Sequence, residues 1–154
     1  TAAVVNNVVH NSGDSAIHIY SDANFTAPTV VAMIGNLITQ GPDSRNRQRI
    51  GNGTGQAVNA GTLVYLEGNL QEGNISVFDV ESVPNATLVG TSPLTLPAGL
   101  NVVSAYSLEA TLVNCADPAQ SDVGANHKDI TDIRLITEFC ARGGSIKDAP
   151  PPGE

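Results

Sequence analysis

Residues 3–13 read AVVNNVVHNSG, and this stretch has two counterparts later in the chain, MIGNLITQG (33–41) and LEGNLQEG (66–73). Each stretch has apolar residues, then an Asn, then Val or Leu, and soon a Gly. The aligned residues, Asn7, Asn36 and Asn69, are 29 and 33 positions apart. Repeats of this length are typical of solenoids, in which each repeat forms one coil.

Asn at a repeated turn has a physical reason. Asn tolerates the left-handed backbone conformation, and its side chain can bond neighbouring main-chain groups. When such turns stack in successive coils, we expect the amides to hydrogen-bond to one another in a ladder. The pattern therefore predicts a mostly β protein with a partial parallel β-helix of about three coils. The alternative is a β-sandwich whose turns contain Asn-Gly-like pairs.

The rest of the chain divides into strands and then helices. Apolar runs predict further strands at 16–20, 29–34, 63–66 and 75–80. After Pro97 the apolar period becomes helical. One helix is expected within 104–116, with Ser104 as N-cap and with one apolar face made by Ala105, Leu108, Leu112 and Cys115. A second is expected within 126–144, capped by Asn126 or Asp129, ended by Gly143–Gly144, and apolar along Ile130, Ile133, Ile136, Phe139 and Cys140.

These patterns give three parts. Residues 1–97 are expected to form coils and loops, residues 98–148 a helical clamp that docks against the strands, and residues 149–154 a flexible Pro-rich tail. Cys115 and Cys140 each fall near the end of an expected helix. A bridge between them would close a loop of about 25 residues and stabilise the fold by roughly 3 kcal/mol. Two buried free thiols are the alternative.

Composition limits the function classes. The 154 residues carry a net charge of −8, which argues against nucleic acid and anionic membranes as partners. No apolar run approaches the ~20 residues that span a bilayer. The acidic, Lys-poor composition and even Cys count favour a secreted, extracellular protein. Four Asn-x-Ser/Thr sequons, which a eukaryotic secretory host could glycosylate, lie at Asn24, Asn52, Asn74 and Asn85.

The residues alone predict no catalytic constellation. His10, His18 and His127 lack neighbours at metal-ligand spacing, so we interpret them as structural or solvated. Asp79 and Glu81 alternate along one expected strand, but two carboxylates are too few for Ca²⁺. The loop 41–55 holds the basic residues Arg45, Arg47 and Arg49, which could contact an anionic substrate or could be merely solvated.

Three stretches in order resemble the C-terminal half of the pectate lyases, the family-one polysaccharide lyases. They are AVVNNVVHNSGDSAIHIY (3–20), VVAMIGNLITQGPDSRNR (30–47) and NHKDITDIRLITEFCARGGSIKDAPPPGE (126–154). In the last stretch, the positions that match the family are Asp129, Asp132, Arg134 and Gly143. The resemblance covers most of the chain.

The resemblance implies a right-handed parallel β-helix, secretion, and cleavage of α-1,4-linked galacturonan by β-elimination. In that reaction a base removes the proton beside the uronate carboxylate, which Ca²⁺ neutralises. The family's base is an Arg in an Arg-x-Pro-x-x-Arg stretch, which this sequence lacks, and its place would fall just before Thr1. The family's Ca²⁺ ligands also lie upstream of the matching strand. No catalytic residue or metal ligand can therefore be assigned, and we expect this chain alone to be inactive.

Three interpretations follow. The first is the C-terminal portion of a secreted pectate-lyase-like enzyme that acts on an acidic polysaccharide. The second is a non-catalytic β-solenoid module with a structural or interaction role. Because an uncapped coil exposes strand edges, both predict N-terminal coils, another chain or self-association at the open end. The third, an unrelated carbohydrate-binding module, is disfavoured because the chain has no Trp and only three Tyr, whereas sugar rings usually stack on aromatic side chains.

Overall fold

The computed structural model describes residues 1–12, 16–19, 21, 26–44, 50–51, 57–72, 83–123 and 127–144. The strands in this part of the chain are short, as the many Asn and Gly residues between apolar runs require. They are β1 (Ala2–Val5), β2 (Val8–His10), β3 (Ile17–His18), β4 (Val30–Ile34), β5 (Leu37–Thr39), β6 (Ile50–Gly51), β7 (Thr62–Glu67), β8 (Leu70–Gln71) and β9 (Ala86–Val89).

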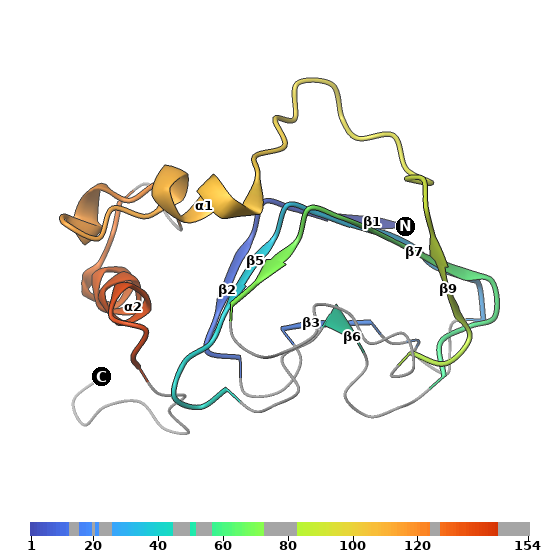
Figure 1. Ribbon diagram of the computed structural model, residues 1–154, viewed down its shortest axis with the longest axis horizontal. Coiled ribbons are helices and arrows are strands. Elements are labelled where there is room, and N and C mark those ends of the chain that lie inside the picture. The colour runs from blue at the N-terminus through green and yellow to red at the C-terminus, as the bar shows by residue number, and fades with distance from the viewer. Residues whose placement is uncertain are drawn as a thin grey trace.

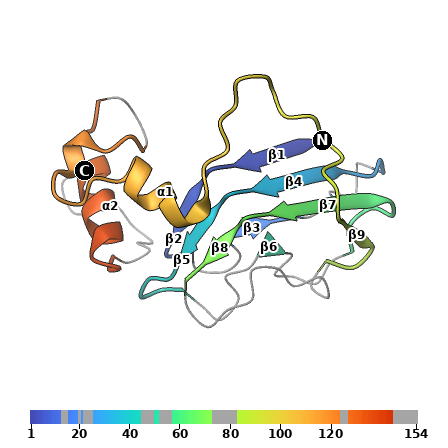
Figure 2. The same cartoon turned by 45° about the horizontal axis from the view of Figure 1, so that its top comes forward.

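The strands form three parallel sheets (Figures 1 and 2). The largest has the order β1-β4-β7-β9, the second β2-β5-β8, and the third pairs β3 with β6. Between β1 and β4, and equally between β2 and β5, paired residues are 29 positions apart. The next pairs in both sheets are offset by 33 positions. These offsets equal the Asn spacings in the sequence, so the repeat is confirmed as the unit that pairs strands.

A tight turn links the first sheet to the second in each repeat. Asn6, Gly35 and Gly68 have φ values of 55°, 64° and 60°, the left-handed conformation. The aligned Asn follows each of them, so the prediction that this Asn itself takes the left-handed conformation is wrong by one residue. At Gly35 an added Cβ would lie 2.6 Å from the carbonyl oxygen of Val103, so the close approach of that segment requires glycine.

Two apolar regions lie on opposite faces of the second sheet. The interior core contains Met33, Ile38 and Val64, which are fully buried, together with Ile19, Val31, Val58 and Val83. Because strand side chains alternate, Leu37 and Thr39 face away from Ile38. Both are nevertheless buried, since α1 packs against β5. Apolar clamp residues are buried as well, namely Ala105, Leu108, Ile136 and Phe139.

The clamp helices are shorter than their expected ranges. Helix α1 is Ala105–Leu112; Ser104 is its N-cap residue but makes no side-chain capping bond. Helix α2 is Ile130–Cys140, and Asp129 caps it in a reciprocal capping box with Asp132. A single 3-10 turn, η2 (Pro118–Gln120), lies between the two helices. Ile130 was expected on the apolar face, but it is 81% exposed because it is the first helical residue and lies away from the buried second half.

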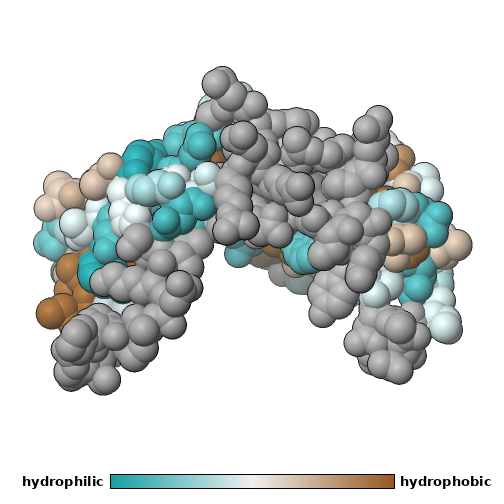
Figure 3. Space-filling model, turned by 90° about the horizontal axis from the view of Figure 1, so that it is seen from below, coloured by the Kyte–Doolittle hydropathy of each residue, from teal (hydrophilic) through white to brown (hydrophobic). Residues whose placement is uncertain are grey.

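The expected disulfide is present between Cys115 and Cys140, with a Cα–Cα distance of 5.6 Å. Cys140 ends α2, whereas Cys115 follows α1 by three residues. Strand β9 was missed, and the strand expected at 75–80 lies outside the described residues. Among the described helices, none is long and apolar enough to cross a membrane. Figure 3 shows the molecule from below. Hydrophilic and hydrophobic described residues are mixed on this face, and hydrophobic ones are visible at the helical end.

Candidate functional site

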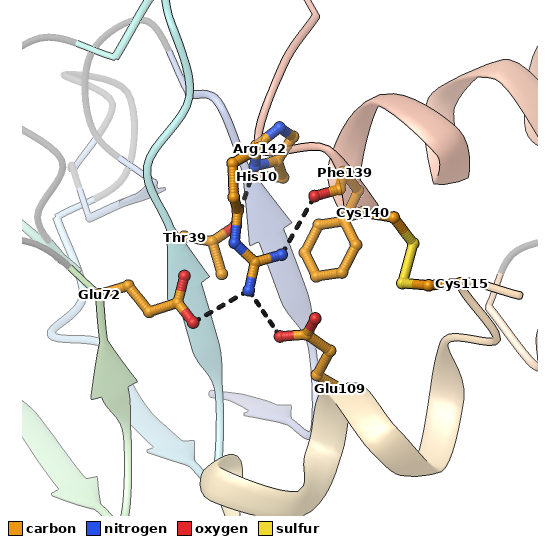
Figure 4. A network of polar contacts seen from close by, with 8 residues as sticks. All are labelled: His10, Thr39, Glu72, Glu109, Cys115, Phe139, Cys140 and Arg142. Atoms are coloured by element: carbon orange, nitrogen blue, oxygen red, sulfur yellow. Dashed lines mark hydrogen bonds and ion pairs between the residues drawn. A yellow bond between two sulfur atoms is a disulfide. The ribbon is translucent and has the colours of Figure 1, made fainter.

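A polar network joins the clamp to the strand ends (Figure 4). Arg142, just after α2, donates from Nη2 to Glu72 Oε1 at 3.0 Å and to Glu109 Oε2 at 2.7 Å. Its guanidinium carbon lies 4.6 Å from the centroid of the Phe139 ring, and Nη1 donates to the Phe139 carbonyl. One cation thus links the residue after β8, helix α1 and the end of α2, and it forms ion pairs with two carboxylates.

His10 connects the same network to β2 and β5. Its Nδ1 lies 2.9 Å from Thr39 Oγ1, and its Nε2 lies 3.0 Å from the Gly143 carbonyl oxygen. A carbonyl oxygen only accepts, so Nε2 carries the proton and donates it to Gly143. The imidazole edge also meets the Phe139 ring at a centroid distance of 5.3 Å. Both ring nitrogens are engaged, so His10 has no free nitrogen to act as a general base.

The hydrogen bond to Glu109 raises the pKa of Arg142 above its usual value, although partial burial acts in the opposite direction. Arg142 therefore remains a cation throughout the working pH range. Its φ of 51° is left-handed, a conformation uncommon for a residue with a side chain. Arg142 and His10 have their polar partners within the network, so its geometry fits a role in holding the clamp rather than in binding substrate.

A cavity of about 280 Å³ lies where the 102–106 segment crosses the tight turns. Gly35 and Gly68 line it together with Ile34, Val102 and Tyr106, and Glu67 contributes a carboxylate. The Tyr106 side chain is 82% exposed. Tyr65 donates from its hydroxyl to Glu67 Oε2 at 2.7 Å, and this bond raises the pKa of Tyr65 above its usual value of 10.0. The cavity combines apolar residues with the Glu67 carboxylate and the side chains of Ser104 and Tyr106.

The aligned asparagines form the expected ladder. Asn7 donates from its main-chain N–H and from Nδ2 to Asn36 Oδ1, each at 3.0 Å. Asn36 donates in the same two ways to Asn69 Oδ1, at 3.0 and 2.8 Å. Asn36 is fully buried, whereas Asn7 is exposed. The ladder therefore has one end at the surface, beside the edge strands β1 and β2.

The residues that the sequence singled out lie mostly elsewhere. Arg45, Arg47, Arg49, Asp79, Glu81 and the sequons at Asn24, Asn52 and Asn74 lie outside the described residues. Asn85 is described and exposed, and its Nδ2 donates to the Val58 carbonyl. His18 and His127 are exposed and are not brought together with His10. Within the described part of the chain, no group of His, Cys, Asp and Glu has the geometry of a metal site.

Comparison with known proteins adds no relative. No protein-family model, no curated protein and no solved structure matches this chain.

Sequence reasoning missed the network around Arg142. Its members come from positions 10, 39, 72, 109 and 142, which share no local motif. The available signal was a cation in the last turn of an expected helix, in a chain with few cations. Finding its two carboxylate partners required the docking of the helices.

Proposed function

We propose that the three parallel sheets are the faces of a right-handed parallel β-helix of the pectate-lyase kind. The chain would then supply coils and the helical clamp to a secreted protein that cleaves galacturonan by Ca²⁺-assisted β-elimination. One observation carries this proposal most: the registers of 29 and 33 residues, shared by two sheets and continued by the Asn ladder. A sandwich of antiparallel strands would give neither the parallel pairing nor an offset that two sheets share.

The proposed chemistry belongs to residues outside this chain. The sequence has no Arg-x-Pro-x-x-Arg stretch, and His10 and Arg142 are committed to holding the clamp. We therefore expect no unsaturated product when this chain alone is incubated with polygalacturonate and Ca²⁺. The absorbance of the unsaturated uronate is the readout. Product formation by the isolated chain, beyond that of a boiled sample, would show that the chemistry was assigned to the wrong residues.

Charge decides how an acidic polysaccharide is held. The net charge of −8 repels polygalacturonate, so binding requires local positive charge or bridging cations. Three of the seven Lys and Arg residues lie at Arg45, Arg47 and Arg49. We propose this loop as the polysaccharide contact, because Arg pairs with carboxylates through two parallel hydrogen bonds.

Affinity electrophoresis in polygalacturonate gels tests this contact. Replacing Arg45, Arg47 and Arg49 by Ala should remove most of the retardation, and added salt should weaken retardation of the unmodified chain. The matched control is Arg134→Ala, which removes a partly exposed Arg of α2 that forms an ion pair with Glu138. Equal loss in the control, or none in the triple variant, would count against the loop. A gel that contains a neutral polysaccharide distinguishes recognition of charge from nonspecific binding to polysaccharide.

A second candidate function is a non-catalytic β-solenoid module that assembles with other polypeptide. The exposed end of the ladder beside β1 and β2 favours it. If the arginine loop does not bind polysaccharide but the chain associates through that end, this second function is preferred.

A further inference from the structure

The interior asparagine of the ladder shows what a complete ladder position contains. Asn36 Oδ1 accepts two hydrogen bonds from Asn7, in the preceding coil. Asn36 Nδ2 donates one bond to Asn69, in the following coil, and one back to the Val4 carbonyl at 2.9 Å. Asn69 repeats the backward bond, from Nδ2 to the Met33 carbonyl. Val4 and Met33 are register partners, so the backward bond always reaches the same position.

Asn7 lacks every bond that comes from the preceding side. No described residue donates to its Oδ1, which in Asn36 accepts twice. Its Nδ2 donates to the Val5 carbonyl of its own strand, at 3.0 Å, whereas Asn36 Nδ2 donates to the Val4 carbonyl of the preceding repeat. Asn7 also keeps its forward bonds to Asn36. The ladder is therefore directional. Its exposed end offers an incoming segment two groups of Asn7: the acceptor Oδ1 and the Nδ2–H that now bonds to Val5.

Burial follows the same direction. In the second coil Ala32, Met33, Asn36 and Ile38 are fully buried. Their register partners in the first coil are less covered: Ala3 and Asn7 are exposed, and Val4 and Val9 are half-buried. Strands β1 and β2 are also the outermost strands of their sheets. The surface of this coil therefore combines unpaired strand edges, apolar side chains and the incomplete amide of Asn7.

We propose that this surface binds one further polypeptide coil of the strand–Asn–strand type, parallel to β1 and β2. The incoming coil supplies an Asn whose main-chain N–H and side-chain amide donate to Asn7 Oδ1. It also supplies the main-chain carbonyl that Asn7 Nδ2 reaches once it leaves Val5. This arrangement gives Asn7 the same partners as Asn36 and pairs both edge strands.

A second copy of this chain does not fit as that coil. Continuing the ladder would place Asn69 of the second copy against Asn7, because Asn69 is the last ladder residue. That requires β1 to pair with β7 of the second copy. Strand β7 is already paired on both edges, with β4 and with β9. The occupant is therefore a further strand–Asn–strand coil that is not one of the three described repeats, and it is recognised by its Asn.

A peptide carrying the chain's own second coil is a suitable probe. The probe is TVVAMIGNLITQ (29–40), extended by lysines for solubility and labelled with a fluorophore; its matched control carries Asn36→Ala. Fluorescence anisotropy against the full chain measures both affinities. The alanine keeps its main-chain N–H, so the control loses only the hydrogen bond from the side-chain amide to Asn7 and should bind roughly three- to tenfold more weakly. In the full-chain variant Asn7→Ala, the two peptides should bind equally, which a double-mutant cycle quantifies.

Two results would overturn the inference: equal binding of both peptides to the unmodified chain, or no binding of either. Sedimentation can also overturn it. If the unmodified chain forms a saturable dimer that the probe peptide cannot disrupt, a second copy occupies the edge. Unfolding curves of Asn7→Ala verify that the variant folds. The inference shares the β-helix of the proposed function but not its substrate, so polygalacturonate binding can fail independently of peptide binding.

Discussion

At the scale of single residues, Asn36 is the polar side chain with the greatest consequence for the fold. It is fully buried, and its amide bonds to three neighbours: Asn7, Asn69 and the Val4 carbonyl. A buried amide is tolerated only when its hydrogen bonds are made, and here other coils make them. One residue thus connects three consecutive repeats.

Replacing Asn36 by Ala should therefore destabilise the chain by about 3 kcal/mol, because several buried hydrogen bonds are lost and their partners are left unsatisfied. Chemical denaturation measures the change in the free energy of unfolding. Asn7→Ala is the control, with an expected loss of about 1 kcal/mol because Asn7 is exposed. Equal losses at the two positions would mean that the ladder contributes little beyond a local turn.

Tyr65 gives a residue-scale prediction about pH. Its hydroxyl donates to Glu67, which raises the folded-state pKa above 10.0. A raised pKa means that this bond stabilises the fold fully below pH 10 and is lost as the pH rises through the folded-state pKa. In a chain with Tyr20→Phe and Tyr106→Phe, phenolate absorbance reports Tyr65 alone. Adding Glu67→Gln should lower its titration midpoint; an unchanged midpoint would rule out the bond as the cause.

At the scale of elements, patterns local in sequence predicted more than patterns that depend on docking. The Asn repeat gave the strand offsets, and Asp129 was a correct N-cap because capping uses residues only three apart. The prediction that Ile130 belongs to the buried apolar face was wrong, because helical periodicity identifies an apolar face but not how much of that face a neighbour covers. Strand β9 was missed because ATLV carries neither an Asn nor a repeat signal. The Arg142 network needed tertiary contacts.

Helix α1 attaches the clamp through Leu108, which is fully buried in the helix that packs on β5. Leu108→Ala should destabilise the chain by about 3 kcal/mol, since it leaves a cavity between the helix and the sheet. Leu135→Ala in α2 is the matched control, because Leu135 is 50% exposed, and it should cost less than about 1 kcal/mol. Thermal unfolding of both variants compares them. Similar shifts would mean that α1 is not the principal attachment.

At the scale of the whole molecule, the strands and the clamp have separate apolar regions that meet at the second sheet. The clamp is held by packing on β5, by Arg142 and by the disulfide. The coils do not contain a covalent cross-link within the described residues. The two parts should therefore differ in how they respond to a reductant.

Reduction of Cys115–Cys140 should remove roughly 3 kcal/mol, the value for a loop of about 25 residues. The loss should fall mainly on the clamp. Hydrogen exchange is the measurement: amides of α1 and α2 should exchange faster under a reductant, while those of β4 and β7 should change little. The double variant Cys115→Ser with Cys140→Ser controls for effects of the reductant itself. A uniform increase across all elements would mean that strands and clamp unfold as one unit.

The tight turn beside the ladder has a consequence for how this chain can change its length. Two residues separate the end of one strand from the start of the next in each of the three repeats, from Val5 to Val8, Ile34 to Leu37 and Glu67 to Leu70. The difference between 29 and 33 residues therefore arises entirely outside this turn. Insertions elsewhere in a coil lengthen a loop at small entropic cost. An insertion inside the turn would displace its Asn from the ladder, so we expect the length of this turn to be kept while the loops vary.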